Sequence, residues 1–157
     1  MTTKNKTLLI IANTPSPNTS RMVSAILKGA QHEDIEGITA IHIEPLKATP
    51  EDVLIADAII LGTTENLGYL SGALKDFFDR CYYPCLEKTQ GLPYSLYIRA
   101  GHDGTGAQRA TQTIVTGLRW REVHKPLVCK GDFQESFITE CEELGMYMAA
   151  GLESSIF

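Results

Sequence analysis

Runs of apolar residues alternate along this chain with segments whose apolar positions recur every three or four residues. The runs contain few charges and do not alternate strictly with polar residues, which is typical of strands that are covered on both faces. They predict five strands, at residues 7–13, 39–43, 58–63, 94–100 and 127–130.

The segments between these runs have the periodicity of amphipathic helices. Thr49 followed by Pro50 is typical of a hydroxyl cap before a first-turn proline, and Asp132 with Glu135 three residues later indicates a capping box. The predicted helices begin near residues 20, 50, 71, 106 and 132.

Five strands that are each followed by a helix predict an α/β fold, a doubly wound three-layer sandwich around a parallel sheet. No linker or repeat divides the 157 residues, so we expect a single domain covering residues 1–157. In the strand order 2-1-3-4-5, strands one, three and four are neighbours. Ligands of such sheets bind beyond the carboxyl ends of the strands, where the order reverses.

The first predicted strand continues directly into a polar turn, residues 14–20, and then into a helix. A helix N-terminus favours an anion, because free N–H groups and the positive end of the helix dipole point to one place. The turn has no Lys or Arg, which suits the terminal phosphate of a mononucleotide better than a triphosphate with its metal. The residues expected around such a phosphate are Thr14, Ser16, Asn18, Thr19 and Ser20.

Two further loops of unusual composition follow strands three and four, at residues 62–72 and 100–106. Their glycines would allow close approach of the backbone, and their polar groups could contact a flat ring. Taken singly, each loop can equally be interpreted as ordinary turn-forming sequence. Three such loops on adjacent strand ends favour a shared ligand site.

The most specific motif combines a Gly-Thr-Thr start at Gly62 with Gly68, Ser71 and the Leu-Lys-x-Phe-x-Asp-Arg segment ending at Arg80. It resembles the G-T-P-x-x-x-G-x-x-S-x-x-L-K-x-F-x-D-R stretch of NAD(P)H-dependent FMN reductases and quinone reductases. These reductases belong to the flavodoxin-like superfamily, and the turn at residues 14–19 is similar to the T-x-T-G-N-T phosphate loop of flavodoxins. The glycine-rich third loop is similar to the loop that borders the flavin in quinone reductases.

The resemblance covers nearly the whole chain and implies noncovalently bound FMN. In the second loop it implies binding by Thr63, Thr64, Glu65, Asn66, Leu67, Gly68 and Tyr69. In the third loop it implies binding by Ala100, Gly101, His102 and Gly104.

The chain also departs from flavodoxins. Pro17 stands where their phosphate loop has glycine, so the loop must follow a different path. Tyr69 and His102 are the only aromatic rings in the second and third loops, which would leave the flavin less shielded than in flavodoxins. An open ring face suits an enzyme that transfers hydride from NADH or NADPH to FMN and on to a quinone, a flavin or a similar acceptor. The alternatives are a flavodoxin-type single-electron carrier between protein partners and a module without a redox role.

The chemistry of this enzyme would reside in the flavin, so no side chain is expected to be a covalent catalyst. His102 could stabilise charge at the pyrimidine end of the ring, and Tyr69 could stack near it; both could also be plain surface or packing residues. Glu65 and Asn66 are interpreted as contacts to the ring edge or ribityl chain, or as exposed loop tips.

The composition limits the kinds of partner that we expect the protein to bind. A net charge of -5, with both signs mixed along the chain, argues against nucleic acid or an anionic membrane, because both need a basic surface. No apolar stretch approaches the length of a bilayer, and the polar residues 1–6 do not look like a signal peptide, so we expect a cytoplasmic protein.

In the cytoplasm the four cysteines are interpreted as reduced, mostly buried thiols, and no metal site is expected. The expected partners are a small-molecule electron donor and acceptor. Trp120, which lies between two arginines, leaves a homodimer contact as an open alternative.

Overall fold

The computed structural model of the protein describes residues 5–157. Its strands are β1 (Lys6–Ala12), β2 (Ile38–Ile43), β3 (Ala58–Asn66), β4 (Tyr69–Leu70), β5 (Pro93–Ala100), β6 (Arg121–Glu122) and β7 (Leu127–Lys130). Its helices are α1 (Pro17–Ala30), α2 (Pro50–Leu54), α3 (Gly72–Cys85), α4 (Thr105–Gly117) and α5 (Glu135–Glu153).

The strands form one sheet whose main path is β2-β1-β3-β5-β6, with all neighbours on this path parallel. The doubly wound parallel arrangement agrees with the prediction, and so does the order of the four long strands. The predicted count of five is wrong, because β4 pairs antiparallel with β3, and two short strands, β6 and β7, both pair with β5. Strands as short as β4 and β6 carry too few residues for a hydrophobic pattern to reveal them.

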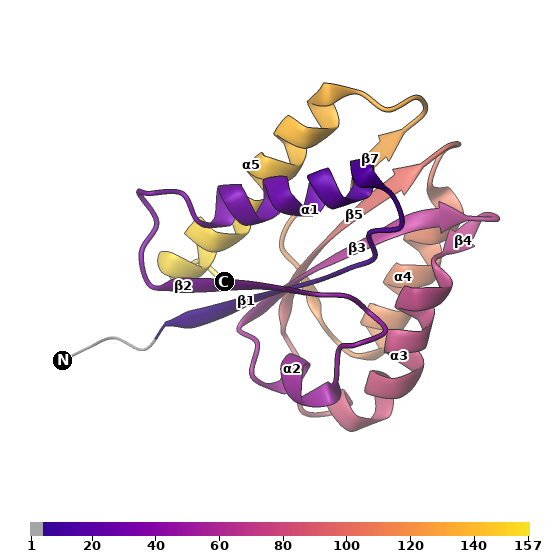
Figure 1. Ribbon diagram of the computed structural model, residues 1–157. Helices are drawn as coiled ribbons and strands as arrows, with labels where there is room; N and C mark the ends of the chain where they lie inside the picture. The colour runs from indigo at the N-terminus through magenta and orange to yellow at the C-terminus, as the bar shows by residue number, and fades with distance from the viewer. Residues whose placement is uncertain (1–4) are drawn as a thin grey trace.

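Helices cover both faces of the sheet (Figure 1). α1 and α5 pack on one face, and α3 and α4 pack on the other, with α2 beside α3. Successive residues of β1 therefore enter different cores: Leu8 and Ile10 face α1 and α5, whereas Leu9 and Ile11 face α3. Burial on both faces explains why the strands have no alternation of apolar and polar residues.

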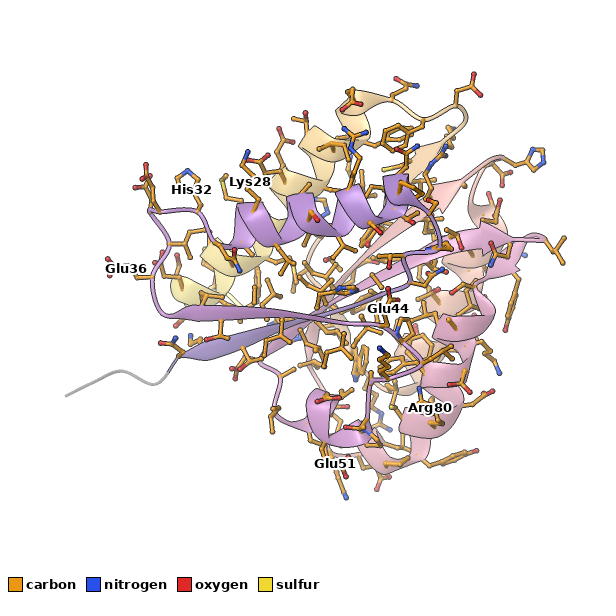
Figure 2. All side chains as sticks on the ribbon, in the orientation of Figure 1. Lys28, His32, Glu36, Glu44, Glu51 and Arg80 are labelled. Carbon is orange, nitrogen blue, oxygen red and sulfur yellow. The ribbon has the colours of Figure 1, made fainter. Side chains whose placement is uncertain are left out.

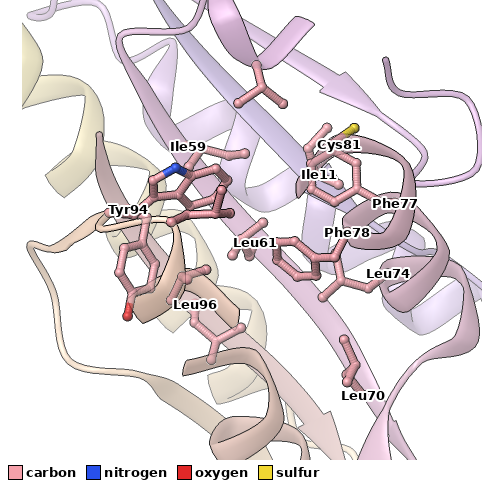
Figure 3. Packing of buried hydrophobic residues seen from close by; sticks show 14 of the residues in the cluster. Ile11, Ile59, Leu61, Leu70, Leu74, Phe77, Phe78, Cys81, Tyr94 and Leu96 are labelled. Carbon is pink, nitrogen blue, oxygen red and sulfur yellow. The ribbon is translucent and has the colours of Figure 1, made fainter. Parts of the chain in front are cut away.

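The core under α3 and α4 is rich in aromatic rings (Figure 3). Phe77 and Phe78 of α3 pack close to each other, with ring centroids 5.1 Å apart. Trp120 is buried in this core, and its indole N–H donates a hydrogen bond to Thr89 at 2.8 Å. Trp120 is thus a core residue of the chain itself.

Two helix starts differ from the prediction. α1 begins at Pro17 instead of residue 20, because Ser16 is already the N-cap and Pro17 fits the first helical position. α5 begins at Glu135, so the capping box predicted from Asp132 does not form, and Gln134 precedes the helix without a side-chain cap. α2 starts as predicted, with the Thr49 hydroxyl accepting a hydrogen bond from the Asp52 N–H.

Within residues 5–157 no helix is long and apolar enough to cross a bilayer. All four cysteines are buried, as predicted. Residues 1–4, which belong to the polar start from which the absence of a signal peptide was inferred, lie outside the described part of the chain.

Candidate functional site

The carboxyl ends of β1, β3 and β5 lie side by side at one edge of the sheet. Ala12 of β1 pairs with Gly62 of β3, and Thr64 of β3 pairs with Arg99 of β5. The three loops singled out in the sequence follow these strand ends directly. The structure thus brings together the segments that were predicted to share one ligand site.

The first loop leads from β1 into α1. The Ser16 hydroxyl accepts a hydrogen bond from the Thr19 N–H at 3.2 Å, and the Thr19 hydroxyl accepts one from the Ser16 N–H at 2.9 Å. This reciprocal pair is a capping box, and it occupies two of the N–H donors at the start of α1. Pro17 has no N–H, so the donor that remains free in the first turn within the described residues is the N–H of Asn18.

The five residues predicted around an anion differ in how far they are exposed to solvent. Thr19 is buried beneath the start of α1, whereas the side chains of Asn18 and Ser20 are exposed. The hydroxyl of Thr14 donates a hydrogen bond to the carboxylate of Glu44, the residue after β2. Only Asn18 and Ser20 therefore combine an exposed position with polar groups that the loop itself does not use.

Asn13, the last residue before the first loop, was missed by the sequence analysis. Its side-chain amide donates a hydrogen bond to the hydroxyl of Thr64 at 3.3 Å, which ties the first loop to the end of β3. Its amide oxygen is buried and has no hydrogen-bond partner within the described residues. A buried acceptor without a donor is costly, so this atom is suited to a donor supplied by a ligand or by water.

The second loop is a β-hairpin, although a loop was predicted from residue 64 onward. β3 continues to Asn66, turns at Leu67 and Gly68, and returns as β4, with Glu65 opposite Leu70. Leu67 and Gly68 both have positive φ, 54° and 76°, as the tight turn of a two-residue hairpin requires. The side chain of Leu67 is fully exposed at the tip of the hairpin, and Tyr69 beside it is also exposed.

Buried hydroxyls fix the base of this hairpin. Thr63 accepts a hydrogen bond from the Ser71 N–H at 2.8 Å, and the Ser71 hydroxyl caps α3 by accepting one from the Leu74 N–H. Both hydroxyl residues are buried, so Thr63 acts here as a structural residue and does not face solvent.

The hairpin lies directly on the start of α4. A Cβ placed on Gly106 would lie 1.7 Å from the carbonyl oxygen of Gly68, a distance that no side chain can occupy. Just before α4, Gly104 adopts a φ of 73° and packs against Val128. Glycines at these two positions therefore let the second and third loops close against each other.

The third loop presents its polar residues to solvent. Gly101, His102 and Asp103 are exposed, whereas Ala100 and Gly104 are buried. The carboxylate of Asp103 accepts a hydrogen bond from the Thr105 N–H at 3.0 Å, and this bond lowers the pKa of Asp103 below its usual value. Asp103 is thus a turn residue that precedes α4, and His102 is the exposed ring nearest to it.

Comparison with known proteins shows which fold this arrangement belongs to. Over 111 residues the chain is 30% identical to a flavodoxin of Aquifex aeolicus (strain VF5), a match that covers 71% of this chain and 59% of that protein. Among solved structures, a flavodoxin from the domain Archaea superimposes with a TM-score of 0.75 at 17% identity, over 92% of this chain and 96% of that one. The chain has the flavodoxin-like fold.

Other solved structures with the flavodoxin-like fold are described as something other than a simple flavodoxin. An oxidoreductase from Corynebacterium diphtheriae superimposes with a TM-score of 0.69 at 18% identity, over 97% of each chain. A WrbA-like protein from Agrobacterium tumefaciens gives 0.68 at 16% identity, over 94% of this chain and 96% of that one. No protein-family profile matches the chain.

In this flavodoxin-like sheet a tyrosine of β5 packs over the neighbouring strand β3. A Cβ on Gly62 would lie 2.3 Å from the ring of Tyr97, so the ring occupies the space that a side chain on β3 would need. Burial, with smaller contributions from Cys141, Cys129 and Glu44, raises the pKa of Tyr97 well above its usual value. An uninterrupted apolar run gives no sign of where such a ring points, and the sequence analysis did not single out Tyr97.

The arginines near the strand ends are already engaged. Arg99 donates hydrogen bonds to the carbonyl oxygens of Ala100 and Cys129 and stacks over Phe137, with 5.2 Å from its guanidinium carbon to the ring centroid. Arg21, on the first turns of α1, forms an ion pair with Glu135 at 2.6 Å. Neither guanidinium points freely at the first loop.

A cleft of about 380 Å³ opens beside the first loop, on the side of β2. Glu44 and Lys47 supply its charged groups. Arg80 of α3 holds the segment after Glu44 by donating to the carbonyl oxygen of Pro45 at 2.6 Å. Glu44 and Arg80 are labelled in Figure 2. The cleft is lined by Asn13, Thr14, Pro15, Glu44, Pro45, Leu46, Lys47 and Ala73.

Proposed function

We propose that the chain binds FMN noncovalently and acts as an oxidoreductase that takes hydride from NADH or NADPH and reduces a quinone, a flavin or a similar acceptor. The observation that carries the proposal is the junction of the three loops at the carboxyl ends of β1, β3 and β5, where doubly wound sheets bind ligands. The Aquifex aeolicus relative, described as a flavodoxin, supports a flavin as the ligand.

The residues at this junction fit the ring and ribityl chain of FMN. The unpaired amide oxygen of Asn13 would accept a hydrogen bond from a ribityl hydroxyl. The β3–β4 hairpin, from Thr64 to Tyr69, and the exposed Gly101 and His102 would flank the flat ring. The Asn18 N–H and the Ser20 hydroxyl, at the positive end of the α1 dipole, would face the phosphate.

Bound FMN would supply the redox chemistry, and the protein would orient it and control access. His102 would donate a hydrogen bond toward the pyrimidine end of the ring and favour negative charge there. The third loop has no aromatic side chain other than His102, so one face of the ring would stay open to small molecules. Donor and acceptor would then use the same face in turn, which predicts ping-pong kinetics.

A second candidate is a single-electron carrier that serves protein partners. The same Aquifex aeolicus flavodoxin supports it, since flavodoxin is the name of a carrier. Leu67 and Tyr69 at the tip of the hairpin would then form an apolar contact with the partner. A carrier would be reduced in two separated one-electron steps and would react slowly with free nicotinamide nucleotides.

The test is to purify the protein with added FMN and record its absorbance during anaerobic mixing with NADPH and, separately, with NADH. The enzyme is supported when either nucleotide bleaches the flavin band within seconds and a quinone restores it. A band that neither nucleotide bleaches rules out the enzyme, and a protein that retains no flavin rules out both candidates.

A further inference from the structure

A carboxylate lies beside Thr14, one of the residues expected around a phosphate. Glu44 lies directly after β2, and its carboxylate accepts the hydrogen bond of the Thr14 hydroxyl. Glu44 is half-buried, and no ion pair within residues 5–157 includes it. An acidic side chain in this position was not anticipated from the sequence, because Glu44 belongs to the connection after β2, far from the loop along the chain.

Few backbone N–H groups of the loop are free to hold a phosphate beside this charge: within residues 14–20 they are those of Thr14 and Asn18. Pro15 and Pro17 have no N–H, and the N–H groups of Ser16 and Thr19 are bound in the capping box. Loops that hold a phosphate with backbone donors need several N–H groups directed at one point. Here the first turn of α1 offers the N–H of Asn18.

None of the positively charged groups in residues 5–157 forms an ion pair with Glu44. Lys47 lines the same cleft but makes no ion pair with Glu44, and Arg21 is held by Glu135. On β2, the imidazole of His42 is hydrogen-bonded to the carbonyl oxygen of Ala12 at 2.9 Å.

We propose that Glu44 determines the charge selectivity of the flavin site: it opposes the dianionic phosphate of FMN, so that riboflavin binds almost as tightly as FMN. This inference rests on the proposed function, since it requires that a flavin binds. At a separation of about 6 Å, a dianionic phosphate and a carboxylate repel each other enough to weaken binding roughly tenfold, even with the dielectric constant of water.

The experiment titrates FMN and riboflavin separately into the full-length protein and into Glu44→Gln and measures both dissociation constants by quenching of flavin fluorescence. Gln has the shape of Glu, and its amide oxygen still accepts the Thr14 hydroxyl. The matched control is Glu51→Gln, which removes an exposed carboxylate on α2. Circular dichroism of each variant checks that the fold is retained.

In the wild-type protein we expect the two dissociation constants to differ by less than about tenfold. In Glu44→Gln we expect FMN to bind roughly tenfold more tightly and riboflavin to be unchanged, while Glu51→Gln alters neither. The inference is overturned if the wild type binds FMN a hundredfold more tightly than riboflavin, or if Glu44→Gln leaves the ratio unchanged. Absence of binding of both flavins to the wild type and to Glu44→Gln would instead overturn the proposed function, and this inference with it.

Discussion

Single side chains decide how the three loops are held at the edge of the sheet. Asn13 ties the first loop to Thr64 at the end of β3 by a part-buried hydrogen bond, and Thr63 closes the base of the hairpin by a buried one from the Ser71 N–H. A Thr and an Asn at strand ends are ordinary turn formers in a sequence, and only their partners in space give them these roles.

We predict that Thr63→Val lowers the free energy of unfolding by about 1–3 kcal/mol, because the buried N–H of Ser71 loses its acceptor. The two side chains have similar shapes, so packing changes little. Urea denaturation followed by circular dichroism measures the effect.

The control for this prediction is Thr113→Val. Thr113 lies on the exposed side of α4, where its hydroxyl donates to a carbonyl of its own helix, so we expect a change within about 0.5 kcal/mol. Equal losses in the two variants would mean that the hydrogen bond from Ser71 contributes nothing specific.

Among the secondary-structure elements, the contact between the β3–β4 hairpin and α4 shapes the site most directly. The same kind of close contact joins α1 and α5, where a Cβ on Gly145 would lie 2.0 Å from the carbonyl oxygen of Ile26. Both contacts depend on glycine within a helix, where alanine would be favoured by intrinsic propensity. Glycine stands in both helices despite this cost, because its lack of a side chain lets the backbones approach closely.

We predict that Gly106→Ala weakens FMN binding about tenfold and lowers the free energy of unfolding by about 1–3 kcal/mol, because the new methyl group pushes the hairpin away from α4. Titration calorimetry with FMN and thermal melting measure the two effects.

Gly72→Ala is the matched control, since a Cβ on Gly72 at the start of α3 would meet no atom within 4 Å. It should bind FMN normally and melt at an unchanged or slightly higher temperature. Normal FMN binding by Gly106→Ala would show that the position of the hairpin does not matter to the site.

The whole molecule protects its thiols by placing all of them between the sheet and its helices. Burial raises the pKa of Cys81 to about 12 and also raises the pKa of Cys85. Because the thiolate is the reactive form, a raised pKa and loss of access to solvent act in the same direction.

We predict that the native protein shows no fast reaction with a thiol reagent such as DTNB at pH 8, and that all four cysteines react in guanidinium chloride. A Ser24→Cys variant places a thiol on the exposed side of α1 and should add one fast equivalent. If one thiol of the wild-type protein reacted rapidly with DTNB, at least one cysteine would not be buried as the structure describes.

The sequence by itself determined the fold class and which three loops form the candidate site. Unbroken apolar runs and helical periodicity depend on burial alone, so they revealed a parallel sheet covered on both faces. The order of connections then placed the loops after β1, β3 and β5 at one edge. The local signal of Thr49 followed by Pro50 gave the start of α2.

Only the tertiary structure decided which groups at that edge are free. The capping box of Ser16 and Thr19 started α1 early and used donors that a phosphate was expected to find. The hairpin, the ring of Tyr97 over Gly62 and the contact between Glu44 and Thr14 all join residues that lie apart in the sequence or pair over too few residues to leave a pattern. Hydrogen bonds and close packing depend on distances in space, and a one-dimensional pattern of polarity does not contain them.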